Sequence, residues 1–228
     1  MQDCDFWQDF ITADAAPAAP WLGGYPARVP DGRRLILPIR PLAGTRNAIA
    51  SLILNQAAFR VEAALADILA GLLRPHGPDI VVGLPTLGLS LARAVAERLG
   101  HQRFVPLGTS LKFWYDPALS VPLSSITTPD ATRRLYLDPR LLALLEGRRI
   151  ALIDDVISTG ASIGAGRDRL ALTGASPTVI GAAMLQTRRW ESALAGIPVK
   201  GSFTSPLLQA VTGGWQAAAD QTAVSVKR

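Results

Sequence analysis

The chain has 228 residues, of which 49% are hydrophobic and 18% are charged, and it contains one cysteine. This length suits one α/β domain with a proper core, and the composition is that of an ordinary soluble globular protein. A single cysteine excludes an internal disulfide, which fits a reducing cytoplasm. The formal charge of +5 comes mostly from scattered arginines that form no basic stripe, so we do not expect a nucleic-acid partner.

The first third of the chain starts irregularly and then becomes periodic. Residues 1–32 are rich in alanine, proline and glycine, which predicts an irregular N-terminal arm, and they lack the pattern of a signal peptide. Residues 34–40 have the pattern of a short strand. Charged residues within 48–73 interrupt any apolar run long enough to span a bilayer, so we expect no membrane segment. A helix is predicted over 56–73 from the helical spacing of Val61, Leu65, Ile68 and Leu72.

Strands and helices then alternate along the chain. Apolar segments predict strands at 79–83, 103–107, 149–153, 177–185 and 197–203. Helices are predicted at 87–99 and 161–173, and a glycine follows each of them. Uniformly apolar strands separated by helices indicate an α/β fold, with a parallel sheet of about five strands covered on both faces. Ligands of such sheets bind at the carboxyl ends of the strands.

One segment, residues 108–139, interrupts this alternation. It contains no clean helix, and residues 120–126 and 134–137 have the pattern of a β-hairpin. A long insertion in a compact domain is usually functional, so we expect a flexible lid here. Lys112 lies at its start and is a candidate catalytic cation.

The most informative segment is 149–162, in which an apolar strand leads into two acids and a small polar loop. The adjacent carboxylates of Asp154 and Asp155 suit the hydroxyls of a sugar and a bridging Mg²⁺. The loop and the helix N-terminus after it offer backbone N–H groups to a phosphate, and a glycine there allows close approach. The residues expected to bind the phosphate are Ser158, Thr159, Gly160, Ala161 and Ser162.

This segment resembles the phosphoribosyl-pyrophosphate (PRPP) motif of type I phosphoribosyltransferases, and the resemblance covers roughly residues 50–203. It implies a single domain over 1–228, with a Rossmann-like core, a small hood and a β-ribbon lid. It also implies transfer of a phosphoribosyl group from PRPP to a nucleobase in nucleotide salvage, with Mg²⁺ bound through Asp154 and Asp155. On this reading the protein is cytoplasmic and forms a homodimer.

The segment 81–92 is similar to the pyrophosphate loop of the same family. The resemblance assigns the leaving group to Pro85, Thr86, Leu87 and Gly88. It also implies a non-proline cis peptide bond, for which Thr86–Leu87 is the candidate. Many family members carry a lysine or arginine in this loop, where the present chain has Leu87. Lys112, together with Arg133 or Arg134, would then have to supply the positive charge.

The identity of the base is inferred from single positions, which are less specific than the two loop motifs. Hypoxanthine–guanine enzymes have an aspartate where this chain has Ser158, which cannot act as a carboxylate base. The spacing is closer to the adenine and xanthine branch, in which Asn55, Val156 and Gln186 would contact a purine. Two alternatives remain open at this stage: a PRPP-sensing regulator without catalysis, and a transferase for orotate or another non-purine base.

Overall fold

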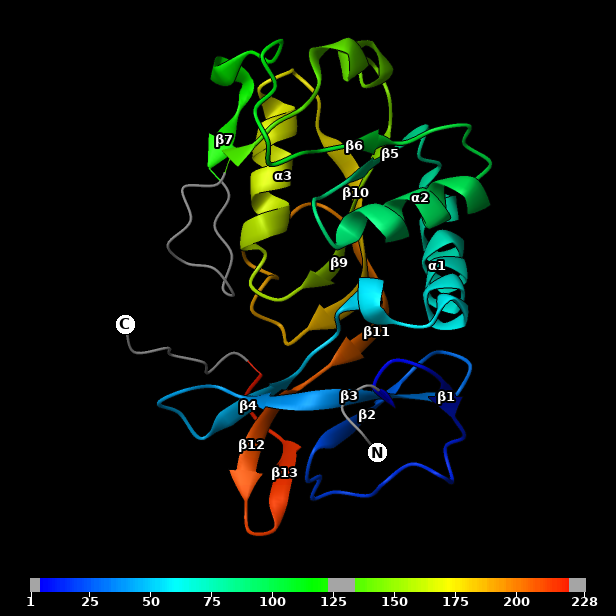
Figure 1. The fold of residues 1–228 in the computed structure, drawn as a ribbon, viewed down its shortest axis with the longest axis vertical. Helices are drawn as coiled ribbons and strands as arrows, with labels where there is room; N and C mark the ends of the chain where they lie inside the picture. Colours follow the sequence, from blue (N-terminus) through cyan, green and yellow to red (C-terminus); the bar gives the residue numbers. More distant parts are fainter. Residues whose placement is uncertain (1–4, 123–133, 222–228) are drawn as a thin grey trace.

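The computed structural model describes residues 5–122 and 134–221. Its core is a five-stranded sheet in the order β11-β10-β9-β5-β6, in which every neighbouring pair is parallel (Figure 1). The strands are β5 (Ile80–Gly83), β6 (Val105–Pro106), β9 (Ile150–Ile157), β10 (Pro177–Gln186) and β11 (Val199–Ser205). The predicted α/β class with about five parallel strands is therefore confirmed.

Helices cover both faces of this sheet. On one face, α1 (Phe59–Leu73) and α2 (Gly88–Arg98) pack with alternate residues of β9 such as Ala151 and Ile153. On the other face, α3 (Ala161–Ala171) packs with the intervening residues, including Leu152. Because both faces are buried, the core strands need apolar residues at every position, which is why their sequence is continuous rather than alternating.

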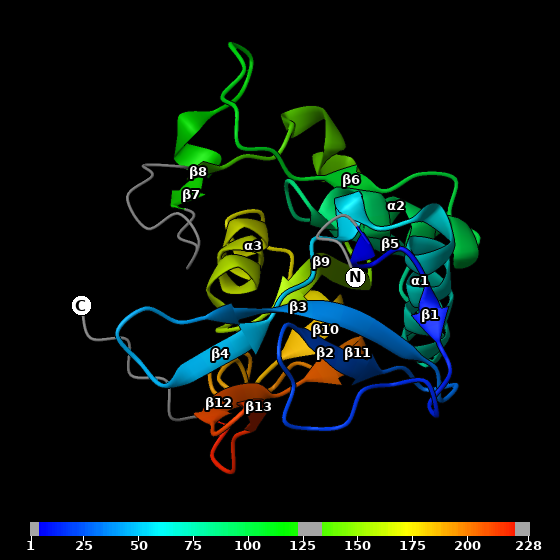
Figure 2. The ribbon, with the colours of Figure 1, turned by 60° about the horizontal axis from the view of Figure 1, so that its bottom comes forward.

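A second, antiparallel sheet forms the hood, and it lies at the end of the core where β9 and β10 finish (Figure 1). Figure 2 shows β3 and β4 crossing the front of the molecule, with β12 and β13 beneath β4. Both halves of the chain supply its strands, which are β1 (Phe10–Ile11), β2 (Gly24–Arg28), β3 (Arg34–Pro41), β4 (Asn47–Ala50), β12 (Leu207–Val211) and β13 (Gly214–Ala217).

The predicted irregular arm over residues 1–32 is wrong in part. β2 pairs with β3 along its whole length, from Gly24↔Pro38 to Arg28↔Arg34, and β1 pairs with β3 at Phe10↔Leu35. The glycines and prolines of this segment make the strand pattern hard to recognise in the sequence. The strands form because β3 supplies an apolar partner only a few residues further along the chain.

The insertion between β6 and β9 contains the predicted ribbon. β7 (Val121–Pro122) pairs antiparallel with β8 (Arg134–Leu135), while the intervening turn and Arg133 lie outside the described residues. Short 3₁₀ helices complete the described chain at η2 (Leu54–Gln56), η3 (Arg74–His76), η4 (Pro117–Leu119) and η5 (Pro139–Leu144). Within residues 5–122 and 134–221, no helix has the length and apolarity to cross a membrane.

Candidate active site

The two acids lie on the central strand of the core. β9 was expected to end at residue 153, but it continues through Asp154 and Asp155 to Ile157 because β10 pairs with it over that length. β5 on the other side stops pairing at Gly83↔Ile153. The carboxyl groups therefore sit just past the end of one neighbouring strand, 7% and 8% exposed.

Burial dominates the electrostatics of this pair. It raises the pKa of Asp154 well above its ordinary value, and the neighbouring charge of Asp155 raises it further. Burial also raises the pKa of Asp155. The Asp155 N–H donates to Asp154 Oδ1 at 2.9 Å, and no lysine or arginine among the described residues forms an ion pair with either acid. Such a pair is suited to a bound cation or to hydroxyl donors.

The predicted pyrophosphate loop joins β5 to α2 and lies directly against Asp154. A methyl group at Gly88 would stand 2.8 Å from Asp154 Cα and 2.9 Å from its Oδ1, so only glycine allows this approach. The non-proline cis peptide bond is Pro85–Thr86, one residue before the expected Thr86–Leu87 bond. The loop brings no cation of its own, because Leu87 occupies the last position before α2.

The predicted phosphate loop follows β9 and leads into α3. Gly160 has φ +84°, a left-handed conformation that glycine adopts without strain, and it precedes the first helical residue, Ala161. Thr159 Oγ1 accepts a hydrogen bond from the Ala161 N–H at 3.4 Å. The first N–H groups of an α-helix have no acceptor within the helix, and Ser158 in the loop and Ser162 in the first turn of α3 add hydroxyl donors near them.

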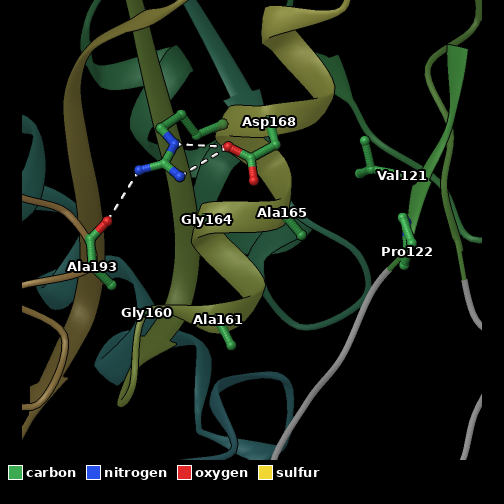
Figure 3. A pocket seen from close by; sticks show the side chains of 9 residues that line it. Val121, Pro122, Gly160, Ala161, Gly164, Ala165, Asp168 and Ala193 are labelled. Atoms are coloured by element: carbon green, nitrogen blue, oxygen red, sulfur yellow. Dashed lines mark hydrogen bonds and ion pairs between the residues drawn. The ribbon is translucent and has the colours of Figure 1, made fainter.

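A turn after β10 supports this loop from behind, and sequence reasoning missed it. A methyl group at Gly160 would stand 3.2 Å from Ala193 Cβ, so the loop packs directly on the turn. Arg167 of α3 donates to the Ala193 carbonyl at 3.0 Å (Figure 3), and Trp190 Nε1 donates to the Thr187 carbonyl at 3.1 Å. The sequence of a glycine-bearing loop does not indicate which other segment of the chain packs against it.

One cavity lies apart from the two acids. It has a volume of about 480 Å³ and lies beside α3, between this helix and the lid strand β7 (Figure 3). Gly160 and Ala161 form its inner end, and Val121 and Pro122 form its outer wall. Strand β7 therefore faces α3 across this cavity, whose lining extends to Gly160 and Ala161 of the predicted phosphate loop.

The remaining predicted residues are spread over the lid, the hood and the core. Lys112 is exposed in the turn after β6 and forms no ion pair among the described residues, while Arg134 donates to Ser120 Oγ at 2.7 Å at the base of the ribbon. Asn55 is exposed in η2, and Val156 is half-buried on β9. Gln186 is buried, and its Nε2 donates to the Ala50 carbonyl at 2.8 Å. This bond ties the core to the hood, and a contact of Gln186 with a base stays a prediction.

This strand–loop–helix arrangement can be compared with known proteins. Residues 52–220 match the family model of the phosphoribosyl transferase domain. The chain belongs to the phosphoribosyl transferase family. The phosphoribosyl transferase domain thus spans the whole core and the C-terminal hood strands, and the recognition of a type I phosphoribosyltransferase is confirmed.

Relatives of this phosphoribosyl transferase domain are adenine enzymes. The chain is 32% identical over 141 residues to the adenine phosphoribosyltransferase of Mycolicibacterium paratuberculosis, covering 60% of the chain and 75% of that enzyme. The solved adenine phosphoribosyltransferase of Rhodothermus marinus superposes with a TM-score of 0.54 at 21% identity, covering 73% of this chain and 93% of that one. The enzyme of Trypanosoma brucei, solved with AMP, pyrophosphate and ribose-5-phosphate, gives 0.55 at 16% identity, covering 73% and 74%. The two structures support the same fold.

Proposed function

We propose that this protein transfers the phosphoribosyl group of PRPP to a ring nitrogen of a purine, with adenine as the first candidate. The observation that carries the proposal is the buried Asp154–Asp155 pair, held between a phosphate-binding loop and a second loop that reaches within contact distance of Asp154. The adenine phosphoribosyltransferases to which the chain is similar support the choice of base.

The reaction places distinct demands on the two loops. The bond from the ribose anomeric carbon to pyrophosphate breaks, a bond from the same carbon to the purine nitrogen forms, and that nitrogen loses its proton. The loop 158–162 would hold the 5′-phosphate, and the carboxyl groups of Asp154 and Asp155 would accept hydrogen bonds from the ribose hydroxyls. Residues 85–88 would bind the leaving pyrophosphate through backbone N–H groups.

Magnesium fits the acids of this site. They have no cationic partner among the described residues, and burial raises the pKa of both acids. A bound cation would oppose this effect by stabilising the ionised carboxylates. Asp154 and Asp155 would hold the ion together with oxygens of the substrate, since no cluster of three or more acidic, histidine or cysteine residues is found in the described chain. When bound, Mg²⁺ would neutralise charge on the pyrophosphate.

One observation favours a second candidate, a protein that binds PRPP without catalysis. The loop that would bind pyrophosphate carries Leu87 where a cation is expected, and Lys112 is free in solvent. Such a protein would bind PRPP and release no pyrophosphate. Product formation therefore separates the two functions.

The test is incubation with PRPP, Mg²⁺ and a panel of purine bases and orotate, read by mass spectrometry of the nucleotide products. We expect AMP from adenine, and a loss of about ten- to a hundredfold in turnover for Asp154→Asn and for Asp155→Asn, because hydrogen bonds to charged groups contribute roughly 1.5–3 kcal/mol. Asp14→Asn, at an exposed carboxyl on the hood side, is the matched control. Binding of PRPP without any product would select the regulator instead.

We also propose that the protein acts as a cytoplasmic homodimer built from one domain per chain. The reducing compartment agrees with the single cysteine. Sedimentation equilibrium at micromolar concentration would measure the subunit number. A monomer would refute the proposed homodimer but would not bear on the proposed transferase reaction.

A further inference from the structure

The turn after β10 begins with a residue in a strained backbone conformation. Thr187 has φ +58°, in the left-handed region, and it is 7% exposed. Within the described chain Trp7 is the only other non-glycine residue with a positive φ. A β-branched residue rarely adopts this conformation, and strain of this kind is concentrated at functional sites. Thr187 follows the end of β10, where Leu185 pairs with Ile157, the last residue of β9 before the predicted phosphate loop.

Three hydrogen bonds hold Thr187 in this conformation. Its N–H donates to the Ser205 carbonyl at 2.8 Å, and its carbonyl accepts a bond from Trp190 Nε1 at 3.1 Å. Its hydroxyl accepts a bond from the Arg189 N–H at 3.4 Å. The first bond ties the residue to the core sheet, and the other two close the turn. The bond from Trp190 has a side-chain donor, so a substitution can remove it and leave the backbone groups unchanged.

The turn forms the surface on which Gly160 of the predicted phosphate loop rests. A methyl group on Gly160 would stand 3.2 Å from Ala193 Cβ and 3.5 Å from Trp190 Cβ. Leu194 approaches the same point at 3.6 Å and is 2% exposed. Arg167 of α3 adds a polar link, since it donates to the Ala193 carbonyl at 3.0 Å (Figure 3). The loop, the start of α3 and the turn therefore pack as one unit.

We infer that Trp190 is a positioning residue for the 5′-phosphate of the substrate, an inference that rests on the proposed transferase function. A glycine-bearing loop has many conformations, and fixing it costs entropy. The indole N–H holds Thr187 in its left-handed conformation, and the turn then holds Gly160 in place. The N–H groups at the start of α3 are thereby oriented before the phosphate arrives, which raises affinity by preorganisation. Trp190 acts through Gly160 and does not bind the ligand itself.

Trp190→Phe tests this inference, because phenylalanine keeps an aromatic ring in the turn and removes the indole donor. Calorimetric titration of the full-length protein with ribose-5-phosphate should give an affinity about three- to tenfold lower than that of the wild type, as expected for one lost hydrogen bond. The affinity for pyrophosphate with Mg²⁺, assigned to residues 85–88, should be unchanged. Trp21→Phe is the matched control, since it removes a 3.0 Å bond from an indole to the Pro17 carbonyl beside the hood strand β13, and it should change neither affinity.

The outcomes separate this inference from the proposed function. Unchanged affinity of Trp190→Phe for ribose-5-phosphate would refute the inference and leave the transferase proposal intact. Equal losses for the two ligands would also refute it, because they would indicate a general loss of structure. A wild-type protein that does not bind ribose-5-phosphate would refute the predicted phosphate site, and the inference with it.

A second variant keeps the test decisive if Trp190→Phe fails to fold. Arg167→Gln removes the bond to the Ala193 carbonyl from a partly exposed side chain, so the fold should tolerate it. It should lower the affinity for ribose-5-phosphate and leave that for pyrophosphate unchanged. Arg93→Gln, which removes an exposed helical arginine with an acidic partner on α2, is its control and should change neither affinity. Unchanged affinity of Arg167→Gln for ribose-5-phosphate would then refute the role of the turn.

Discussion

Asp154 and Asp155 occupy buried positions on β9 without a cationic partner in the described chain. Asp79 at the opposite end of the sheet is a useful contrast, because hydrogen bonds from Arg149 hold its pKa well below the ordinary value. Desolvation raises the pKa of both site acids instead. The ionised form is therefore costly in the free protein, and a cation or a sugar diol would relieve that cost.

Asp154→Asn should stabilise the ligand-free protein at neutral pH. The pKa of Asp154 is higher in the folded than in the unfolded state, so the linked stability is present below the unfolded value of about 3.9 and is lost as pH rises through the folded pKa. Asparagine cannot ionise and keeps an oxygen for the Asp155 N–H. Thermal unfolding from pH 4 to 8 should give a higher Tm for the variant at pH 7–8, by about 2–4 °C for each kcal/mol recovered, and a vanishing difference near pH 4.

The control for this measurement is Glu146→Gln, at an exposed carboxyl on the turn before β9. Its Tm should differ little from that of the wild type across the same range. A variant Asp154→Asn that is less stable at every pH would mean that the carboxylate is structural rather than strained.

Gly88→Ala should impair the site through steric contact alone. The added methyl group meets the backbone of Asp154 at 2.8 Å, so the strand or the helix must shift, and overpacking of this kind costs about 1–3 kcal/mol. We expect a lower Tm and a lower turnover. Gly71→Ala is the matched control, because no atom lies within 4 Å of its added methyl group, and alanine in a helix should stabilise the fold by about 0.5–1 kcal/mol. If both variants behaved alike, the contact with Asp154 would not matter.

At the scale of elements, the predicted lid is fixed at its base. Gly108 and Tyr136 exchange backbone hydrogen bonds of 2.9 and 2.8 Å, and β7 pairs with β8 beyond them. Phe113 is 97% exposed beside Lys112. The insertion therefore holds its two ends together, and the residues after β6 are exposed, from where we propose that they close onto the site.

Lys112→Ala should lower the rate of the chemical step much more than the affinity for PRPP. The reason is that Lys112 is exposed and forms no ion pair with an acid of the described residues, so that it would meet pyrophosphate only after closure. Single-turnover rates and the PRPP dissociation constant measure the two effects separately. Lys200→Ala removes the other lysine of the described chain and serves as control. Equal losses in rate and affinity would make Lys112 a plain binding residue, and no loss would leave it in solvent.

The elements differ in how far the sequence predicts them. The core strands are predictable because burial on both faces demands continuous apolar runs, and 149–162 predicts the site because acids and a glycine loop follow such a run. β4 and β12 are harder to predict, since each is short and their pairing with each other joins distant parts of the chain. The closeness of Gly88 to Asp154, and the turn behind Gly160, depend on packing between elements that no local pattern encodes.

At the scale of the whole molecule, side chains join the hood to the core. Gln186 at the end of β10 donates to the Ala50 carbonyl in β4, and Ser202 Oγ of β11 donates to the Leu65 carbonyl of α1 within the core. The large apolar core includes residues of both sheets, among them Leu37 and Phe203. Hood and core should therefore unfold together.

Unfolding should show one transition, and PRPP with Mg²⁺ should move it upward as a unit. At a ligand concentration one hundred times the dissociation constant, mass action contributes about 2.7 kcal/mol, or about 5–11 °C in Tm. Calorimetry with and without millimolar PRPP and Mg²⁺ makes the measurement, with ribose-5-phosphate plus Mg²⁺ as a partial ligand that should give a smaller shift. An unchanged Tm would refute PRPP binding, and two transitions would refute the assignment of residues 1–228 to one domain.

The hood combines strands from both ends of the chain, so it cannot be completed until synthesis is nearly finished. β4 ends at Ala50, and its neighbour β12 starts at Leu207, so roughly 160 residues must be synthesised between the two. At about 5–20 residues per second, a ribosome needs about 8–32 s for that stretch. During this time the nascent chain exposes the edge of β4, which could pair with other strands. A chaperone that binds extended segments would meet this edge before β12 arrives to cover it.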